Sequence, residues 1–320
     1  MLLSLGIDTS CYTTSIAVVD EKENLIANCR KLLSVKSGEK GLRQSDALFQ
    51  HVKNLPELIE EIRKNVDIRN VNVISVSSKP RPVNDSYMPV FLSGIGFAKV
   101  IAETLQIPIK YYSHQEGHMM AGIWSAGVRS LLNRNFLSFH ISGGTTELLY
   151  VNRIENGFDI KIIGGTRDLH AGQFIDRVGV SLGLPFPSGP YLEKMACEAE
   201  KKVRIPISTQ DLWINFSGPE THAQRLISKG ENPNEIALGV INCISVSIQR
   251  VLESAVNQTG VRDILMVGGV CSNKIMKEYL TGSFYGKANV YFAQPEFSTD
   301  NAVGIALLGL YNMVGSEVFK

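Results

Sequence analysis

A pattern that occurs twice constrains the fold more than any other feature of this sequence. Residues 3–20 consist of a short apolar run, a small polar turn and a second apolar run, and residues 136–152 repeat that order. A third apolar run follows each copy, at 25–34 and at 158–163. Strand, tight polar turn, strand and third strand form a β-meander, and two copies predict two homologous halves.

Two such halves, each continuing into helices, predict an α/β protein with two lobes and a central cleft. The length of 320 residues suits two domains. We expect residues 1–112 to form the N-terminal lobe, completed by a C-terminal helix within 301–320, and residues 113–300 to form the second lobe. Small turns with free backbone N–H groups at facing strand tips can hold phosphate oxygens from both sides of such a cleft.

The spacing of apolar residues between the two copies, and after the second copy, predicts the other helices and strands. Residues 45–65 have helical spacing, and Pro56 predicts a break between two helices. The prolines of 79–85 predict a loop. Further helices are expected at 91–105, 114–132, 171–182, 191–202, 233–258 and 301–313, and further strands at 71–76, 107–112 and 264–267.

Composition excludes several classes of protein. Thirty-two basic and 31 acidic residues give a net charge of +1, so no whole-molecule field favours nucleic acid or anionic membrane. Five scattered cysteines without a CxxC pair indicate neither a disulfide scaffold nor a zinc ribbon, and Cys11 is assigned no role. No leader pattern opens the chain and no apolar run reaches about 18 residues, so a cytoplasmic protein without a membrane span is expected.

Two histidines form the first candidate site. His114 and His118 are four residues apart, so at a helix start both imidazoles share one face and could bind one ion, or could form a solvated or capping pair. Asp300 could supply a third ligand, although residues 299–301 equally suit a helix N-cap. A zinc protease needs glutamate directly after the first histidine, where this chain has Gln115, so protease chemistry is disfavoured.

Glycine turns form the second candidate site. The pairs 143–144 and 268–269 follow expected buried strands, where backbone can approach a ligand closely, whereas 164–165 is expected to be an ordinary turn. Asp176 could accept hydrogen bonds from a ribose or an amide, or could pair with a surface cation. Gly189 is expected in a turn whether or not a ligand contacts it.

Several motifs carry a family resemblance over nearly the whole chain. They are LGIDTSC at 5–11, HQEGH at 114–118, ISGGTTEL at 141–148, AGQFID at 171–176, FSG at 216–218, GGVCSN at 268–273 and PEFSTDN at 295–301. In this order they resemble the TsaD family of tRNA threonylcarbamoyl-adenosine transferases, once described as O-sialoglycoprotein endopeptidases. Ordered co-occurrence is far more specific than any single motif.

The resemblance implies the actin-like, Hsp70-like and sugar-kinase (ASKHA) ATPase fold. It implies an iron or zinc ion held by His114, His118 and Asp300. It also implies that ATP or an adenylate-type nucleotide is held by His140, Ile141, Ser142, Gly143, Gly144, Asp176, Gly189 and Asn273. The family transfers threonylcarbamoyl from threonylcarbamoyl-AMP to adenosine 37 of tRNA. The partners implied are tRNA and either another protein of the TsaD system or a second copy of the chain.

The sequence also departs from the family. Tyr12 and Thr13 replace two acids, Thr145 replaces a histidine, and the segment 79–82, Lys-Pro-Arg-Pro, replaces a Gly-Pro-Gly loop with cations that could meet phosphate or carboxylate. This pattern favours a paralogue with a changed acceptor or reaction. We therefore expect a carbamoyl-group transferase whose acceptor is open between tRNA and a smaller molecule. The alternatives are a degenerate nucleotide-binding subunit and, least favoured, a metalloprotease. Two imidazoles and a carboxylate suit iron, zinc or manganese as the ion.

Overall fold

A computed structural model describes residues 1–10, 12–35 and 42–314 of the chain. The chain divides into two compact units. Unit 1 comprises Met1–Gly127, Arg153–Asp159 and the residues from Thr299 onward, and unit 2 comprises Val128–Asn152 and Ile160–Ser298. Cys11, to which the sequence assigned no role, lies outside the described residues.

Unit 1 is built on a sheet of five strands in the order β3-β2-β1-β4-β5. The strands are β1 (Leu3–Asp8), β2 (Thr13–Asp20), β3 (Leu25–Leu32), β4 (Val73–Lys79) and β5 (Ile109–Ser113). Strands β1, β2 and β3 form the predicted antiparallel meander, and β4 and β5 extend it in parallel. The ends of β1, β4 and β5 therefore meet at one edge of the sheet.

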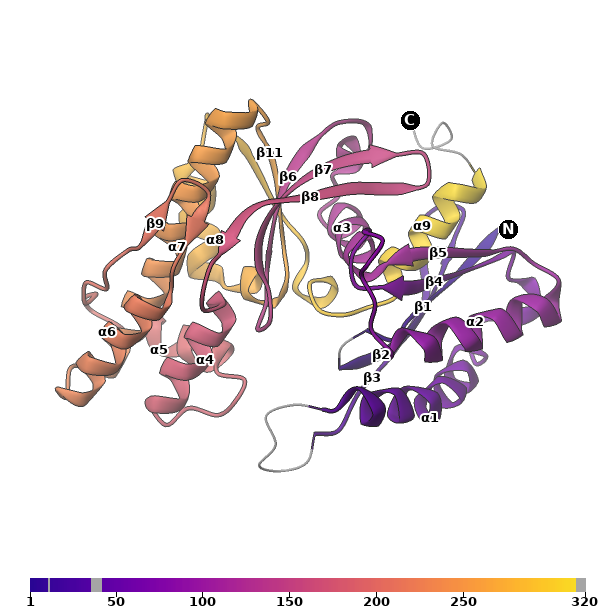
Figure 1. Ribbon diagram of the computed structural model, residues 1–320, viewed down its shortest axis with the longest axis horizontal. Helices are drawn as coiled ribbons and strands as arrows, with labels where there is room; N and C mark the ends of the chain where they lie inside the picture. The colour runs from indigo at the N-terminus through magenta and orange to yellow at the C-terminus, as the bar shows by residue number, and fades with distance from the viewer. Residues whose placement is uncertain (11, 36–41, 315–320) are drawn as a thin grey trace. The chain divides into compact units, whose positions relative to one another are not determined.

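Helices cover both faces of the unit 1 sheet (Figure 1). On one face lie α1 (Gln44–Ile62) and α2 (Phe91–Leu105), and on the other lies α9 (Val303–Val314) with α3 (His114–Ser125) packed against it. Glycines allow this close packing: a Cβ on Gly6 of β1 would lie 2.5 Å from the carbonyl oxygen of Ala302, and one on Gly304 of α9 would lie 1.9 Å from that of Gly117. The start of α9 is thus fixed against α3.

Unit 2 repeats the same strand plan. Its strands are β6 (Phe136–Ile141), β7 (Thr146–Ile154), β8 (Gly157–Thr166), β9 (Thr209–Gln210), β10 (Trp213–Ile214), β11 (Asp263–Val267) and β12 (Asn289–Phe292). They lie in the order β12-β11-β6-β7-β8-β10-β9. The run β8-β7-β6-β11-β12 matches β3-β2-β1-β4-β5 strand for strand. The predicted duplication and the α/β ASKHA fold class are therefore confirmed.

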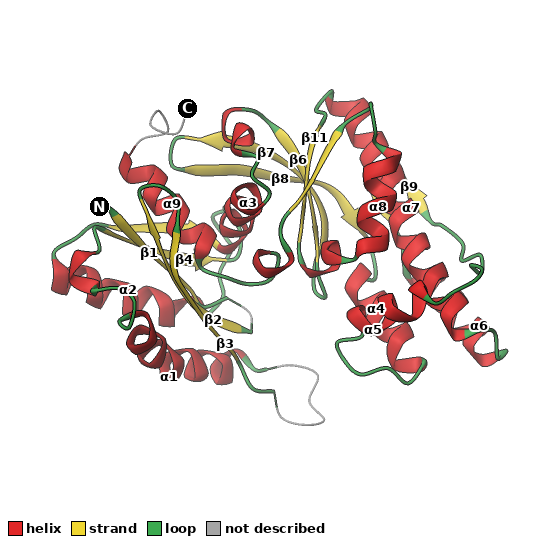
Figure 2. Cartoon of the chain, turned by 180° about the vertical axis from the view of Figure 1, so that it is seen from behind, coloured by secondary structure: helices red, strands yellow, loops and turns green. Residues whose placement is uncertain are grey.

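The helices of unit 2 surround a long central helix, α7 (Figure 2). They are α4 (Ala171–Ser181), α5 (Gly189–Cys197), α6 (Ser217–Ser228), α7 (Pro233–Thr259) and α8 (Lys274–Ser283). Short 3-10 turns occupy Ile68–Asn70, Arg129–Asn133, Gly269–Ser272 and Pro295–Phe297. By length and composition α7 is apolar enough to cross a membrane, but 67% of its most apolar stretch is buried within the protein, as in a core helix.

Several predictions about single elements were wrong. The helix expected over 191–202 runs instead over Gly189–Cys197, so Gly189 lies in a helix and not in a turn. Pro56 does not break α1, because the carbonyl that it leaves unpaired belongs to Val52, on a side of the helix open to water, while Leu55 and Leu58 stay buried. The pair 164–165 is not a turn but lies inside β8, where a Cβ on Gly164 would meet the carbonyl oxygen of Leu212 at 2.2 Å. The helix expected over 114–132 ends at Ser125.

Candidate functional site

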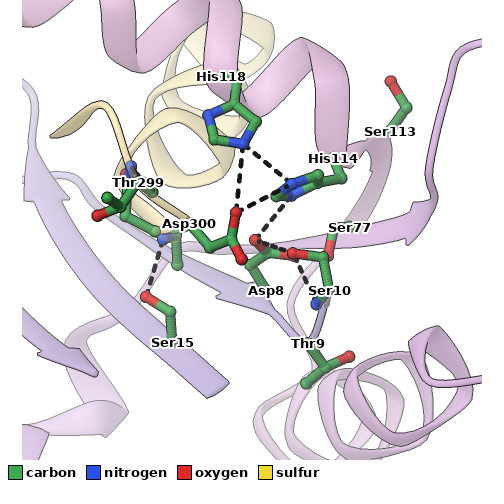
Figure 3. A network of polar contacts seen from close by, with 12 residues as sticks. Asp8, Thr9, Ser10, Ser15, Ser77, Ser113, His114, His118, Thr299 and Asp300 are labelled. Carbon is green, nitrogen blue, oxygen red and sulfur yellow. Dashed lines mark hydrogen bonds and ion pairs between the residues drawn. The ribbon is translucent and has the colours of Figure 1, made fainter. Parts of the chain in front are cut away.

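The three predicted metal ligands lie together in unit 1 (Figure 3). His114 and His118 come from the first turns of α3, and Asp300 comes from the segment before α9. The Nε2 atoms of the two histidines are 3.0 Å apart, and each lies 3.5 Å from Oδ1 of Asp300. Ligand atoms more than 180 residues apart in sequence thus converge on one point.

These separations fit a metal ion. Zinc–nitrogen and zinc–carboxylate bonds of 2.0–2.2 Å in tetrahedral geometry place neighbouring ligand atoms about 3.3 Å apart. The three observed separations, 3.0, 3.5 and 3.5 Å, lie close to that value. Two imidazoles and one carboxylate leave coordination positions open for water or substrate, as in catalytic zinc and non-haem iron sites. The residues present therefore fit the iron or zinc ion that the sequence implies.

The start of α3 is fixed by a capping box. The Ser113 hydroxyl accepts a hydrogen bond from the Glu116 N–H, at 3.2 Å, and Oε2 of Glu116 accepts from the Ser113 N–H, at 2.7 Å. The other oxygen of Glu116 accepts from the Phe158 N–H, at 3.1 Å. Glu116 is therefore a structural residue that holds the two histidines in place, and it does not act as the base of a protease.

Asp8, which the sequence did not single out, completes the site. Its Oδ2 lies 2.9 Å from Nδ1 of His114, and the carboxylate is fully buried at the end of β1. It also accepts from the Ser10 N–H, at 3.1 Å, and from the hydroxyls of Ser10 and Ser77. A carboxylate at Nδ1 holds the proton on that nitrogen and leaves Nε2 of His114 bare for an ion.

The four groups shift one another's pKa values. Burial works to raise the pKa of Asp8 and Asp300, but the adjacent histidines outweigh it and hold both pKa values below their usual range. Burial works to lower the pKa of His114, but Asp8 and Asp300 raise it well above its usual value. Burial and the charge of His114 lower the pKa of His118. The cluster therefore keeps both carboxylates ionised, as a cation site requires.

Asp300 does not cap α9. Oδ1 of Asn301 accepts from the Val303 N–H, at 3.0 Å, so Asn301 takes the capping role that the sequence left open. The Ala302 N–H donates to the hydroxyl of Ser15 on β2, at 2.9 Å. The segment is therefore anchored to the sheet two residues after the metal ligand, and the Asp300 carboxylate lies beside the imidazoles.

The basic segment also lies beside α3. Lys79, at the end of β4, pairs in register with Ser113, and the carbonyl of Pro80 accepts from the Gln115 N–H, at 3.0 Å. A cationic residue therefore pairs directly with Ser113, the N-cap of the helix that holds both histidines.

In unit 2, the predicted nucleotide turn follows β6, which ends with His140 and Ile141. The Ser142 N–H donates to the Thr145 carbonyl, at 2.8 Å, and the Gly144 N–H donates to the Ser142 hydroxyl, at 3.3 Å. A Cβ on Gly143 or Gly144 would meet no atom of the described residues within 4 Å. The glycines thus border open space, as close approach of a ligand requires.

Of the other predicted nucleotide residues, Asp176 lies in the middle of α4, and Gly189 and Asn273 lie at the starts of α5 and α8. Oδ1 of Asp176 accepts from the Ser188 N–H, at 2.7 Å, directly before Gly189, and burial raises the pKa of Asp176. Asn273 caps α8 through a bond of 2.9 Å from the Met276 N–H. The adjacent Lys274 N–H donates to Glu193 of α5, at 2.7 Å, which ties α8 to the helix that begins at Gly189.

Comparisons with known proteins give a family match over most of the chain. The family model described as "TsaD: tRNA N6-adenosine threonylcarbamoyltransferase" matches residues 33–307. Proteins with that name from Archaeoglobus fulgidus and Thermus thermophilus are 27% and 31% identical, over 97% and 95% of this chain and 91% and 90% of their own.

Solved structures support the fold alone. Component A of (R)-2-hydroxyglutaryl-CoA dehydratase from Acidaminococcus fermentans has a TM-score of 0.59 at 16% identity, over 98% of this chain and 100% of that one. A ROK-family glucokinase from Streptomyces griseus has a TM-score of 0.51 at 12% identity, over 96% and 99% of the two chains.

Proposed function

Because the chain belongs to the TsaD family, the tRNA N6-adenosine threonylcarbamoyltransferases, we propose that it is a metal-dependent transferase that moves threonylcarbamoyl from threonylcarbamoyl-AMP to adenosine 37 of tRNA. In that step the exocyclic N6 forms a bond to the carbamoyl carbon, the bond from that carbon to the phosphate oxygen breaks, AMP leaves with the electron pair, and the amine releases a proton. No covalent bond to the protein is required.

The convergence of His114, His118 and Asp300 is the observation that carries the metal-dependent form of this proposal. A bound iron or zinc ion supplies positive charge that polarises a carbonyl or phosphate oxygen. The protein's part is to present the Nε2 atoms of both histidines and a carboxylate oxygen at ligand spacing. Asp8 orients the His114 ring, and the capping box of α3 keeps both rings on one face.

In unit 2, the turn of 142–145 would hold the nucleotide phosphate through the backbone N–H groups of Gly143 and Thr145, because those of Ser142 and Gly144 are bonded within the turn. Asp176, Gly189 and Asn273 would border the nucleotide from the helices α4, α5 and α8. In unit 1, the cation of Lys79 suits an anionic group of the substrate, and the threonyl carboxylate of threonylcarbamoyl-AMP is such a group.

Modification of tRNA tests the proposal directly. Protein loaded with zinc or iron is incubated with threonylcarbamoyl-AMP and unmodified tRNA, and the nucleosides are analysed by mass spectrometry. We expect threonylcarbamoyl-adenosine with the wild-type chain and with His222→Ala, a histidine of α6 outside both sites, and none with His118→Ala. Unmodified adenosine in the presence of intact bound metal would exclude tRNA as the acceptor.

We expect the reaction in the cytoplasm, with nucleotide and tRNA as substrates. A second protein of the same system, or a second copy of this chain, is the expected partner. If wild-type protein binds nucleotide or such a partner but turns over with no acceptor, the chain is instead a degenerate regulatory subunit.

A further inference from the structure

A pocket of about 680 Å³ in unit 2 shares no residue with either candidate site. It is lined by the segment 202–207 and by residues of the helices α6 and α7. Lysine and arginine contribute three of its side chains, Lys202, Arg204 and Arg250, and none of its lining residues is acidic. Its volume lies within the range of pockets that bind ligands. The pocket therefore combines a ligand-sized hollow with charges of one sign.

Backbone packing brings the three cations to this pocket. The segment 202–207, which carries two of them, runs along α7, and Sγ of Cys243 donates to the Pro206 carbonyl, at 3.4 Å. Arg250 follows Cys243 by seven residues, which is about two turns, so it lies on the same face of α7. The segment is thus held over the helix face that supplies the third cation.

The three cations have no counter-charge within the described ranges of the chain. None of them forms an ion pair there, and Nζ of Lys202 donates to the neutral side chain of Asn242, at 3.4 Å. Glu253, the acid of α7 closest in sequence to Arg250, is paired with Lys287 at 3.6 Å. Like charges around one pocket repel one another, and an anion bound between them offsets that repulsion. The pocket therefore suits an anionic group from outside the chain.

We propose that this cationic pocket, defined by Lys202, Arg204 and Arg250, binds phosphate groups of the RNA backbone and forms part of the surface on which tRNA docks. The inference rests on the proposed function for the identity of the RNA. A chain with a net charge of +1 has no overall field that attracts a polyanion, so local groups of cations must supply its phosphate contacts. Arginine matches two phosphate oxygens with its planar donors, and lysine adds a point charge.

The salt dependence of RNA binding tests the proposal. Binding of fluorescently labelled, unmodified tRNA to the full-length chain is followed by anisotropy at several salt concentrations. Each cation that neutralises a phosphate contributes about one to the slope of log K against log salt, so Lys202→Ala and Arg250→Ala should each lower the slope by about one. With equal affinity at about 1 M salt, this corresponds to a roughly tenfold loss of affinity at about 0.1 M. Both side chains are exposed, so the core stays intact.

Two control variants separate the pocket from general effects. Lys201→Ala removes the same charge from an exposed neighbouring lysine that does not line the pocket, and it should keep most of the wild-type slope. His222→Ala alters the lining but leaves all three cations in place, and it should keep the wild-type slope as well. An equal loss in Lys201→Ala and Lys202→Ala would overturn the proposal, because net charge alone would then explain the effect.

The other source of phosphate is a free ligand. Inorganic phosphate and AMP are therefore titrated calorimetrically into the wild-type chain and Lys202→Ala, and we expect the two proteins to bind each of them equally. The proposal is overturned if Lys202→Ala weakens only the free ligands, if both pocket variants keep the wild-type slope, or if the wild-type chain does not bind tRNA. Transfer to tRNA with unchanged slopes would refute the pocket alone, whereas tRNA binding through the pocket without transfer would refute the proposed function alone.

Discussion

Replacing Asp8 by asparagine tests how the buried carboxylate controls the metal site. The substitution keeps the size of the side chain but removes the negative charge 2.9 Å from Nδ1 of His114. Mutating a residue that orients a metal-ligating histidine typically lowers metal affinity 10- to 100-fold. This corresponds to a loss of about 1.4–2.7 kcal/mol of binding free energy. We expect Asp8→Asn to weaken zinc binding by an amount in this range.

The size of the effect should depend on pH. In the wild-type chain Asp8 helps to raise the pKa of His114, so a proton competes with the ion at a pH where an ordinary histidine would be neutral. Removing the Asp8 charge lowers that pKa and reduces the competition. The deficit in zinc affinity of Asp8→Asn should therefore grow as pH rises and narrow as pH falls toward the usual histidine pKa of about 6.5.

A chelator competition assay measures this. Metal-free protein and a chromophoric chelator share a limited amount of zinc, and the dissociation constant is read across the pH range. Asp20→Asn is the matched control. Asp20 is also a buried carboxylate of the unit 1 sheet, but its hydrogen bonds within the described part of the chain come from the turn residues Lys22 and Asn24. Equal zinc affinity of Asp8→Asn and wild type at every pH, with the fold intact, would refute the role given to Asp8.

Three further predictions concern stability. Ser113→Ala removes the N-cap of α3 and should lower the free energy of unfolding in urea by about 1 kcal/mol; no change would contradict the capping box. Gly304→Ala should cost about 1–3 kcal/mol and weaken zinc binding, because its Cβ meets Gly117, whereas Gly282→Ala in open space should not destabilise the chain. Burial works to raise the pKa of Asp168, but three backbone N–H donors outweigh it and lower that pKa, so its stabilisation is present above its usual value of 3.8 and is lost as pH falls further. Asp168→Asn should make the free energy of unfolding depend less on pH in that range. An acid unfolding transition identical to that of the wild type would contradict this.

Much of the fold is predictable from the sequence because the local spacing of apolar and polar residues determines its strands and helices. Strand, turn and strand alternate within a few residues, and the repetition of that unit at 136–152 predicts the matching strand orders of the two sheets. Pro56 and the pair 164–165 were predicted wrongly because their conformations depend on their surroundings and not on local spacing. Val52, whose carbonyl Pro56 leaves unpaired, lies on an exposed side of the helix, and the backbone of Leu212 packs against Gly164.

The site was predictable where spacing alone defines it. His114 and His118 are four residues apart, so helix geometry places them on one face. Asp300 was a candidate from the sequence, but only the family resemblance favoured it as a ligand over a helix N-cap, because nothing local ties it to α3. Asp8 was missed because its contact with His114 depends on the order of β1, β4 and β5, which brings the ends of these strands together.

X-ray absorption at the zinc edge of the loaded full-length chain tests the central claim most directly. We predict one ion per chain with two imidazole ligands and at least one carboxylate oxygen, no sulfur, and loss of one imidazole from the spectrum in His118→Ala. A spectrum with sulfur ligands, or one that His118→Ala and Asp300→Ala both leave unchanged, would contradict the metal centre proposed here.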